Sequence, residues 1–209
     1  MKTADVIIIG SGAAGLFNAL FLPQDYKVIV ITKKTVEESD SFLAQGGISA
    51  LKNPEDYDSY FEDTMKAGHY ENDKGAVEKM IKESPQIIQD LKDFGVRFDL
   101  KDGEIEFTRE GGHSTFRILH HEDLTGKEIT SHLYEEAKKR DNITIMENCM
   151  MIDIIEKDGE CKGIVYKDQD GNFDTIEAPD TVLATGGLGG LFKHSTNFRH
   201  LTADSLAIC

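Results

Sequence analysis

The sequence predicts an α/β fold in which a parallel sheet is packed with helices and accompanied by a small antiparallel side sheet. The chain begins with a short apolar run, residues 5–9, that ends at a glycine-rich turn, as in a strand buried on both faces of a parallel sheet. A helical segment and a second apolar run follow at once, which makes the first thirty residues a βαβ unit. Residues 153–177 instead resemble antiparallel hairpins, because strand-like runs flank two Asp-Gly pairs.

The remaining elements follow along the chain. Helical periodicity marks three segments, residues 13–22, 54–94 and 127–140. Apolar runs typical of short buried strands mark three others, residues 27–31, 143–147 and 181–184. Residues 32–53 are expected to form a loop, and residues 96–121 to form short strand-like pieces. The hairpins of the side sheet are expected to turn at Asp158-Gly159 and Asp170-Gly171 in the type I′ conformation.

Two helices carry more detailed signals. Ser84 followed by Pro85 predicts an N-cap and a first helical position, and Gly95 predicts the end of that helix. Its apolar face is expected to consist of Ile87, Ile88, Leu91 and Phe94. In the segment 127–140, one stripe is apolar, so this helix is expected to cover the sheet; the stripe consists of Ile129, Leu133 and Ala137.

Composition and charge limit the class of protein. The 209 residues, 39% hydrophobic and 29% charged, are typical of a globular chain with one large domain or a domain with an insertion. The net charge of −15 argues against nucleic acid and anionic membranes as partners. No apolar run is long enough to cross a bilayer or to form a secretory signal, so we expect a cytoplasmic protein. The three cysteines lack CxxC spacing, so we expect reduced thiols and no zinc site.

The first glycine-rich turn carries a nucleotide-binding motif. Gly10-Ser11-Gly12-Ala13-Ala14-Gly15 fits G-x-G-x-x-G and lies between a buried strand and a helix, as the motif requires. Gly10 permits the tight turn, Gly12 lets a pyrophosphate approach the backbone, and Gly15 lets helix and strand pack closely. The helix N-terminus supplies amide donors and a positive dipole. We therefore predict a Rossmann-like domain that binds a dinucleotide over the start of the first helix.

The acidic residue that usually binds the ribose, about 20 residues after the motif, is missing. The second strand runs into Thr32-Lys33-Lys34, and the nearest acids, Glu37 and Glu38, lie several residues further on. Thr32 or a lysine would then bind the adenosine half of the ligand. A preference for the extra phosphate of NADP is one alternative, and a solvated lysine pair is another.

The loop after the βαβ unit favours a flavin over a nicotinamide. It contains Gly46-Gly47, and paired glycines would let backbone amides lie against a planar ring or its oxyanion. An ordinary surface loop is the alternative interpretation.

Five segments together resemble the L-aspartate oxidases, which belong to the succinate dehydrogenase and fumarate reductase flavoproteins. They are DVIIIGSGAAG (5–15), AQGG (44–47), TREGGHS (108–114), RILH (117–120) and LATGG (183–187). The resemblance implies an FAD-binding domain with non-covalent FAD, and oxidation of L-aspartate to iminoaspartate with oxygen or fumarate as acceptor. It also implies the first step of de novo NAD biosynthesis and quinolinate synthase as a partner. Asp40 stands where covalent relatives have the histidine that bonds to the flavin.

The same resemblance assigns site residues. Glu110 is implied as the catalytic and substrate-binding residue near the substrate amino group, where a carboxylate would favour L-aspartate over succinate. His113 is implied as a second substrate-binding residue. A solvated glutamate and a structural histidine are the alternatives. The implied cofactor-binding residues are Gly10, Ser11, Gly12, Ala13, Ala14, Gly15, Thr32, Lys33, Ser41, Phe42, Leu43, Ala44, Gln45, Gly46, Gly47, Thr185, Gly186 and Asp204.

Two further candidates have simpler explanations. Asp204 could act only as a helix N-cap. His120 and His121 are consecutive, so on a strand they would point to opposite faces and make poor joint metal ligands. We expect no metal site.

The organisation of the chain follows from these assignments. We expect a dinucleotide-binding βαβ unit with a flavin loop (1–53), a helical, substrate-side insertion (54–142), and a side sheet that returns to the core sheet (143–209). Residues 202–209 begin an amphipathic helix that has no cap, so we expect a truncated chain without its capping domain, inactive or weakly active on its own. A soluble fumarate reductase or succinate dehydrogenase relative and a non-catalytic FAD-binding module remain the alternatives.

Overall fold

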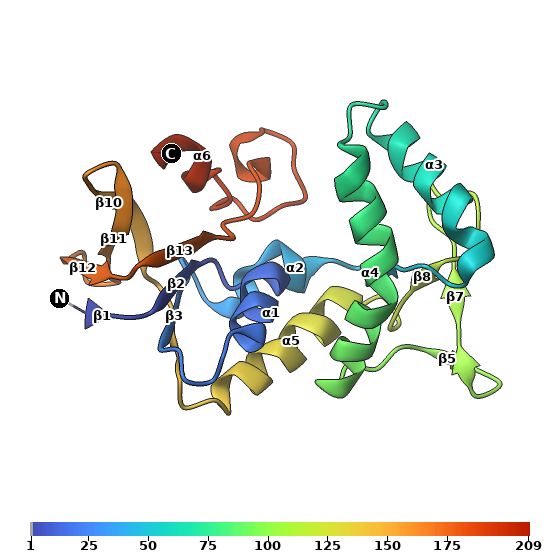
Figure 1. Ribbon diagram of the computed structural model, residues 1–209, viewed down its shortest axis with the longest axis horizontal. Coiled ribbons are helices and arrows are strands. Elements are labelled where there is room, and N and C mark those ends of the chain that lie inside the picture. The colour runs from blue at the N-terminus through green and yellow to red at the C-terminus, as the bar shows by residue number, and fades with distance from the viewer. Residues whose placement is uncertain (1) are drawn as a thin grey trace. The chain divides into compact units, whose positions relative to one another are not determined.

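The structure is a computed structural model that describes residues 2–209 and divides into two compact units (Figure 1). The sheet unit contains the residues up to Leu43 together with Thr130–Cys209. The inserted unit is the continuous segment Ala44–Ile129. The mixed α/β class that the sequence predicts is confirmed.

A four-stranded parallel sheet forms the centre of the sheet unit. Its order is β13-β2-β3-β9, and its strands are Asp180–Leu183, Val6–Ile9, Val28–Ile31 and Ile143–Met146. The two central strands, β2 and β3, are buried at every residue, which explains their unbroken apolar sequence. The expectation of a buried strand is wrong for β13, whose Leu183 is 41% exposed. This strand lies at the edge of the sheet and is paired on one side only.

Two longer helices contribute to the sheet unit. Helix α1 (Ala13–Phe21) ends before Pro23, as expected, and buries one face formed by Gly15, Leu16, Ala19 and Leu20. Helix α5 (Thr125–Lys138) starts in the inserted unit and continues into the sheet unit. Its predicted apolar stripe is confirmed, because Ile129 is 8% exposed and Leu133 and Ala137 are fully buried.

The side sheet is antiparallel except at one edge. Its order is β1-β12-β11-β10, and its strands are Lys2–Thr3, Phe173–Glu177, Glu160–Lys167 and Met150–Lys157. Strand β1 pairs in parallel with β12, and the other pairs are antiparallel (Figure 1). The main core of the unit lies between the two sheets, because alternate residues of β2 and β3 pack against the side sheet; they are Ile7, Ile9, Ile29 and Ile31.

Only one of the two predicted type I′ turns has the required backbone. Asp158 and Gly159 have φ values of +56° and +78°, as a type I′ turn needs. In the second hairpin the prediction is wrong, because of these two turn residues only Gly171 (φ +87°) has a positive φ. The carboxylate of Asp168 accepts hydrogen bonds from the backbone N–H groups of Asp170 and Asn172, both at 2.9 Å, and closes a longer loop.

The inserted unit contains a pair of helices and short strands. The helices are α3 (Tyr57–Ala67), preceded by a 3₁₀ turn at Pro54–Asp56, and α4 (Lys74–Asp93). Three strands pair in the order β4-β8-β7, and β5 pairs with β6; the strands are Ile48–Ser49, Ile118–Leu119, Phe107–Thr108, Leu100–Lys101 and Glu104–Ile105. The helices share a small core of Tyr60, Met65, Val77 and Ile81.

The predicted helix start at Ser84-Pro85 is wrong, because α4 runs through both residues. The helix begins after Asp73, whose carboxylate caps it by accepting from the N–H of Ala76 at 2.8 Å. Pro85 has no N–H to donate to the carbonyl of Ile81, and the hydroxyl of Ser84 donates to that carbonyl instead, at 2.7 Å. The lost backbone bond is thus replaced inside the helix.

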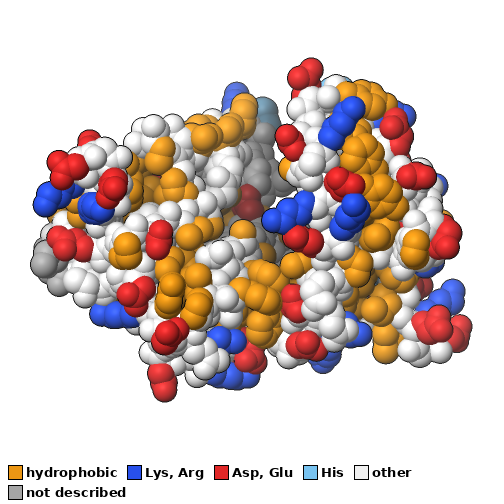
Figure 2. All heavy atoms as spheres, viewed as in Figure 1, with side chains coloured by type: hydrophobic (Ala, Val, Ile, Leu, Met, Phe, Trp, Pro, Cys, Tyr) orange, Lys and Arg blue, Asp and Glu red, His pale blue; other side chains and the backbone are white. Residues whose placement is uncertain are grey.

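The sheet unit also contains four short elements. They are the 3₁₀ turns Val36–Glu38 and Gly189–Leu191 and the helices α2 (Asp40–Leu43) and α6 (Asp204–Ile208). Over residues 2–209, no helix is both long and apolar enough to cross a membrane. Figure 2 shows acidic and basic side chains interspersed over the visible face, without a basic patch there.

Candidate functional site

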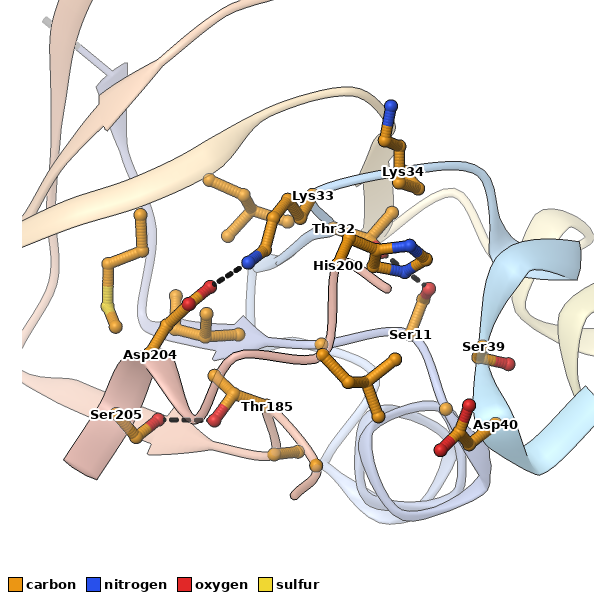
Figure 3. Close-up of a pocket in the computed structure, with 18 of the residues that line it drawn as sticks. Ser11, Thr32, Lys33, Lys34, Ser39, Asp40, Thr185, His200, Asp204 and Ser205 are labelled. Atoms are coloured by element: carbon orange, nitrogen blue, oxygen red, sulfur yellow. Dashed lines mark hydrogen bonds and ion pairs between the residues drawn. The ribbon is translucent and has the colours of Figure 1, made fainter. Parts of the chain in front are cut away.

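A cleft of about 450 Å³ lies in the sheet unit at the carboxyl ends of β2, β3 and β13 (Figure 3). Ligands of open α/β sheets bind in the crevice outside these strand ends. Among the predicted cofactor residues, the following line the cleft: Gly10, Ser11, Gly12, Ala14, Thr32, Lys33, Ser41, Thr185, Gly186 and Asp204. Ala13, Gly15, Phe42 and Leu43 belong to the same unit but do not line it.

The three glycines of the motif have different structural roles. A Cβ on Gly10, whose φ is +113°, would lie 2.2 Å from the carbonyl oxygen of Ala184. A Cβ on Gly15 would lie 1.9 Å from the carbonyl oxygen of Gly10. These two positions must be glycine for the turn and the helix to pack. A Cβ on Gly12 would meet only the side chain of Ser41, whose hydroxyl would lie 3.0 Å away, so the fold itself does not require a glycine there.

Gly12 is also the N-cap residue of α1, and no side chain caps this helix. The first turn of α1 contains no acidic residue. The backbone N–H groups of that turn therefore lack an intrahelical or side-chain acceptor. Together with the helix dipole, they form a site that favours an anionic group such as a phosphate.

Ser11 connects the motif to the next strand. Its side chain is buried, and its hydroxyl donates to the hydroxyl of Thr32 at 2.9 Å. Thr32 follows directly after β3, so this bond joins the ends of two neighbouring strands at the cleft. Figure 3 shows both side chains at the same wall.

Lys33 and Asp204 form an ion pair across the cleft. The ammonium of Lys33 lies 2.6 Å from a carboxylate oxygen of Asp204 and donates to the hydroxyl of Thr202 at 2.9 Å (Figure 3). Their side chains are 22% and 17% exposed, so the interpretation of Lys33 as part of a solvated pair is wrong. Asp204 is not the N-cap either, because that position is Ala203, in the left-handed region.

Asp40 ties α2 to a loop late in the chain. Its carboxylate accepts from the backbone N–H of Phe198 at 3.1 Å and from the side-chain amide of Asn197. A second late contact joins the hydroxyls of Thr185 and Ser205 at 2.6 Å. Sequence reasoning missed this late wall of the cleft, which includes His200, Leu201, Thr202 and Leu206.

Cys149 and Met151 line the cleft as well, and sequence reasoning missed them too. Burial raises the pKa of the Cys149 thiol, so this cysteine is a neutral part of the wall. Because residues two positions apart on a strand face the same side, the spacing of Cys149 and Met151 could have indicated that both side chains point the same way.

The predicted flavin loop continues into the inserted unit, where Ala44, Gln45, Gly46 and Gly47 lie. A Cβ on Gly46 would lie 2.8 Å from a carboxylate oxygen of Glu110, so this carboxylate packs directly on the loop. Gly47 packs against β8, because a Cβ there would lie 2.4 Å from the carbonyl oxygen of Leu119. The structure thus brings the exposed Glu110 and the AQGG segment together.

Among residues 2–209, the largest fully buried side chain is Arg117, whose role sequence reasoning missed. Its guanidinium binds Asp56 through two hydrogen bonds of 2.8 Å and Asp63 through one of 2.6 Å. Burial tends to raise the pKa of Asp56, but hydrogen bonds from Arg117, Thr115 and Ser59 outweigh it and lower that pKa to about 2. Hydrogen bonds to Asp56 in turn raise the pKa of Arg117. Arg117 is therefore a permanent buried charge that organises this unit.

The two consecutive histidines do not lie on a strand, because β8 ends at Leu119. The expectation that they point to opposite faces is wrong, since Nδ1 of His120 and Nδ1 of His121 lie 3.1 and 3.3 Å from the two oxygens of Asp99. Glu122, with a φ of +46°, marks the sharp bend that follows them. Within residues 2–209, no three ligand side chains are arranged to hold a metal ion.

The sequence matches the family described as FAD binding domain over residues 5–209. It is 44% identical to an L-aspartate oxidase of Clostridium perfringens over 99% of this chain and 47% of that protein. It is 46% identical to an L-aspartate oxidase of Clostridium acetobutylicum over 98% of this chain and 47% of that protein. The chain thus spans about half the length of these curated relatives.

Two solved structures share the fold over the whole chain. One is a variant of the E. coli quinol fumarate reductase subunit FrdA, with a TM-score of 0.94, 27% identity, and coverage of 100% of this chain and 37% of that one. The other is Mycobacterium smegmatis Sdh1 in complex with UQ1, with a TM-score of 0.89, 32% identity, and coverage of 100% of this chain and 38% of that one.

Proposed function

The chain belongs to the FAD binding domain family, and from this premise we propose that it is the FAD-binding part of an L-aspartate oxidase. The proposed reaction oxidises L-aspartate to iminoaspartate, with oxygen or fumarate as the final acceptor. We propose that this is the first, cytoplasmic step of NAD biosynthesis, with quinolinate synthase as a partner. The observation that carries the proposal is the contact of the Glu110 carboxylate with Gly46 of the AQGG loop.

The residues of the sheet unit fit FAD. Uncapped N–H groups at the start of α1 suit the diphosphate, and Gly12 leaves the approach to them open. Lys33, paired with Asp204, lines the same cleft, and Thr32 and Thr202 bring hydroxyls to it that are suited to a ribose. When bound, FAD supplies a two-electron acceptor for the hydride of the substrate α-carbon. The predicted cofactor residues of both units are retained in this proposal.

Glu110 is proposed to select the substrate. L-Aspartate carries an ammonium that succinate lacks, and a carboxylate beside it forms a charge-assisted hydrogen bond. Because Glu110 packs on Gly46, its carboxylate is held at the loop that is proposed to contact the flavin. His113 is proposed to contact the substrate from the same loop.

The competing proposal is a fumarate reductase or succinate dehydrogenase relative, which the similarity to FrdA and Sdh1 favours. Two residues argue against it. Asp40 cannot form a histidyl bond to a flavin, and its carboxylate is engaged by Asn197 and Phe198. Glu110 would place a negative charge beside a dianionic substrate that has no ammonium.

The experiment compares L-aspartate with succinate as reductants of FAD bound to this protein, followed by bleaching of the flavin absorbance without oxygen. We expect L-aspartate to reduce the flavin, slowly because the activity of this chain is expected to be weak, and succinate to leave it oxidised. Glu110→Gln, which keeps the shape of the side chain, is expected to weaken L-aspartate binding about tenfold or more and not to weaken succinate binding, because it removes a negative charge beside the dianion. Faster reduction by succinate would favour the competing enzyme. Bound flavin that no dicarboxylate reduces would identify a non-catalytic FAD-binding module.

A further inference from the structure

The buried guanidinium of Arg117 uses every hydrogen that it can donate. An arginine side chain has five N–H donors and no acceptor. Nε and one proton of Nη2 bind the two oxygens of Asp56, and the other Nη2 proton binds the hydroxyl of Ser59 at 2.7 Å. One Nη1 proton binds Asp63 at 2.6 Å, and the other lies toward Nδ1 of His113 at 3.1 Å. The fifth donor is therefore satisfied only if this imidazole nitrogen accepts.

One face of α3 and its N-cap encloses the guanidinium. Asp56, Ser59, Tyr60 and Asp63 follow the spacing i, i+3, i+4 and i+7, which places them on a single helical stripe. The ring of Tyr60 lies 4.8 Å from the carbon of the guanidinium and 6.2 Å from the ring of His113, centre to centre. Arg117 and His113 are thus both held against a rigid helix.

This arrangement decides the tautomer of His113. Arginine remains protonated at any ordinary pH, so it can only donate to Nδ1. A proton on Nδ1 would set two donors against each other and leave a buried N–H without an acceptor, which is costly. The neutral imidazole must then carry its proton on Nε2. No described residue of the inserted unit accepts a hydrogen bond from that Nε2, and the side chain is half-buried.

We propose that Arg117 is a positioning residue that fixes His113 as an Nε2–H donor for a carboxylate oxygen of the substrate. Glu110 and His113 belong to one tight turn, in which the backbone N–H of His113 donates to the carbonyl of Glu110 at 3.2 Å. That turn offers an acceptor for an ammonium and a donor for a carboxylate, the two charged groups of an α-amino acid. The inference rests on the proposed function, which it deepens by naming the atom that contacts the carboxylate.

The tautomer can be measured without any activity. In protein labelled with ¹⁵N-histidine and loaded with FAD, two-dimensional NMR distinguishes a bare ring nitrogen from a protonated one, and the spectrum of His113→Gln assigns the signals. We expect a bare Nδ1 and a protonated Nε2 for His113. Addition of succinate, a dicarboxylate without the amino group, should shift the Nε2 signal of His113. The signals of His120 and His121 serve as internal controls.

Two substitutions of His113 separate its two nitrogens. In His113→Asn the amide can still accept from Arg117, but it does not reach the position of Nε2. In His113→Gln the longer side chain can return a donor to that position. We expect His113→Asn to weaken binding of both succinate and L-aspartate about tenfold or more, and His113→Gln to restore most of it. This pattern differs from Glu110→Gln, which is expected to weaken the binding of L-aspartate alone.

Arg117→Lys keeps the charge but loses the planar set of donors that guanidinium provides, so His113 should populate both neutral tautomers. The matched control Arg97→Lys, at an exposed ion pair, should leave the tautomer of His113 unchanged. If Arg117→Lys does not fold, the measurements on unsubstituted protein and on the His113 variants still decide. A proton on Nδ1 of unsubstituted protein would overturn the proposal. The proposal would also be overturned if succinate changed the flavin spectrum without shifting the His113 signal, or if neither dicarboxylate bound. If succinate shifts His113 but L-aspartate never reduces the flavin, the proposed reaction is wrong and the assignment of His113 stands.

Discussion

Substitution of Gly12 should remove FAD binding without harming the fold, whereas substitution of Gly15 should harm the fold. A Cβ at Gly12 would meet only the side chain of Ser41, whose hydroxyl would lie 3.0 Å away, and that side chain can rotate away. The backbone of Gly12 (φ −68°, ψ 177°) is open to any residue. A Cβ at Gly15 would lie 1.9 Å from the backbone oxygen of Gly10, which cannot move without opening the turn.

The expected magnitudes follow from these contacts. In Gly12→Val, the branched side chain occupies the approach to the first-turn N–H groups of α1. Two hydrogen bonds to a charged phosphate, at about 1.5 to 3 kcal/mol each, would be lost, which corresponds to at least a hundredfold weaker FAD binding. The free energy of unfolding without FAD should change by no more than about 1 kcal/mol. In Gly15→Ala, the overlap with backbone should cost about 3 kcal/mol or more of that free energy.

Both quantities can be measured on the same samples. Flavin fluorescence titration reports FAD affinity, and urea unfolding of the protein without FAD reports stability. The reasoning would be refuted if Gly12→Val purified with a full complement of flavin. It would equally be refuted if Gly15→Ala were as stable as the unsubstituted protein.

Three other predictions concern stability. The pKa of Asp56 is lowered from 3.8 to about 2, so the ionised carboxylate stabilises the folded state fully above about pH 4, and about 2 kcal/mol of the free energy of unfolding is lost as the pH falls toward 2. Measurements of the free energy of unfolding against pH should show this loss, and Asp56→Asn should lack it. Ser84→Ala removes the 2.7 Å bond to the carbonyl of Ile81 and should cost about 1 to 2 kcal/mol in urea unfolding, whereas no measurable change would contradict that role. A double-mutant cycle with Lys33→Met and Asp204→Asn should give a coupling energy of about 0.5 to 2 kcal/mol, and strict additivity would show that the 2.6 Å ion pair contributes nothing.

The elements that were predicted correctly depend on short-range patterns. The runs of β2 and β3 are apolar at every position because both faces of a central parallel strand are buried. The motif between Gly10 and Gly15 was readable because a turn of that shape restricts residues only a few positions apart. The stripe of α5 was likewise readable from helical spacing alone.

The errors arose where a side-chain hydrogen bond within the same segment overrides the signal given by composition. Ser84-Pro85 has the composition of a helix start, but the hydroxyl of Ser84 replaces the backbone bond that Pro85 cannot make, and the helix continues. Asp170-Gly171 has the composition of a type I′ turn, but the carboxylate of Asp168 selects a longer loop. In each case one side-chain hydrogen bond is enough to change the backbone conformation.

In the candidate site, too, the sequence identified single residues, and only the structure shows which of them contact one another. Sequence similarity to the L-aspartate oxidases named Lys33, Asp204 and Glu110 one by one, as separate contacts. The structure pairs Lys33 with Asp204 and sets Glu110 against Gly46. It also shows that the arginine of the RILH segment, Arg117, is a fully buried charge with a partner for each of its donors.

The order of residues was sufficient to predict the parallel βαβ core and the anion site at the start of α1, because each depends on residues that are neighbours along the chain. The class of cofactor came from the resemblance of five separate segments to the L-aspartate oxidases. The tertiary structure alone decided which charges meet and which strand lies at an edge. Those properties depend on groups that are far apart in sequence and become adjacent only when the backbone has folded, so no local pattern records them.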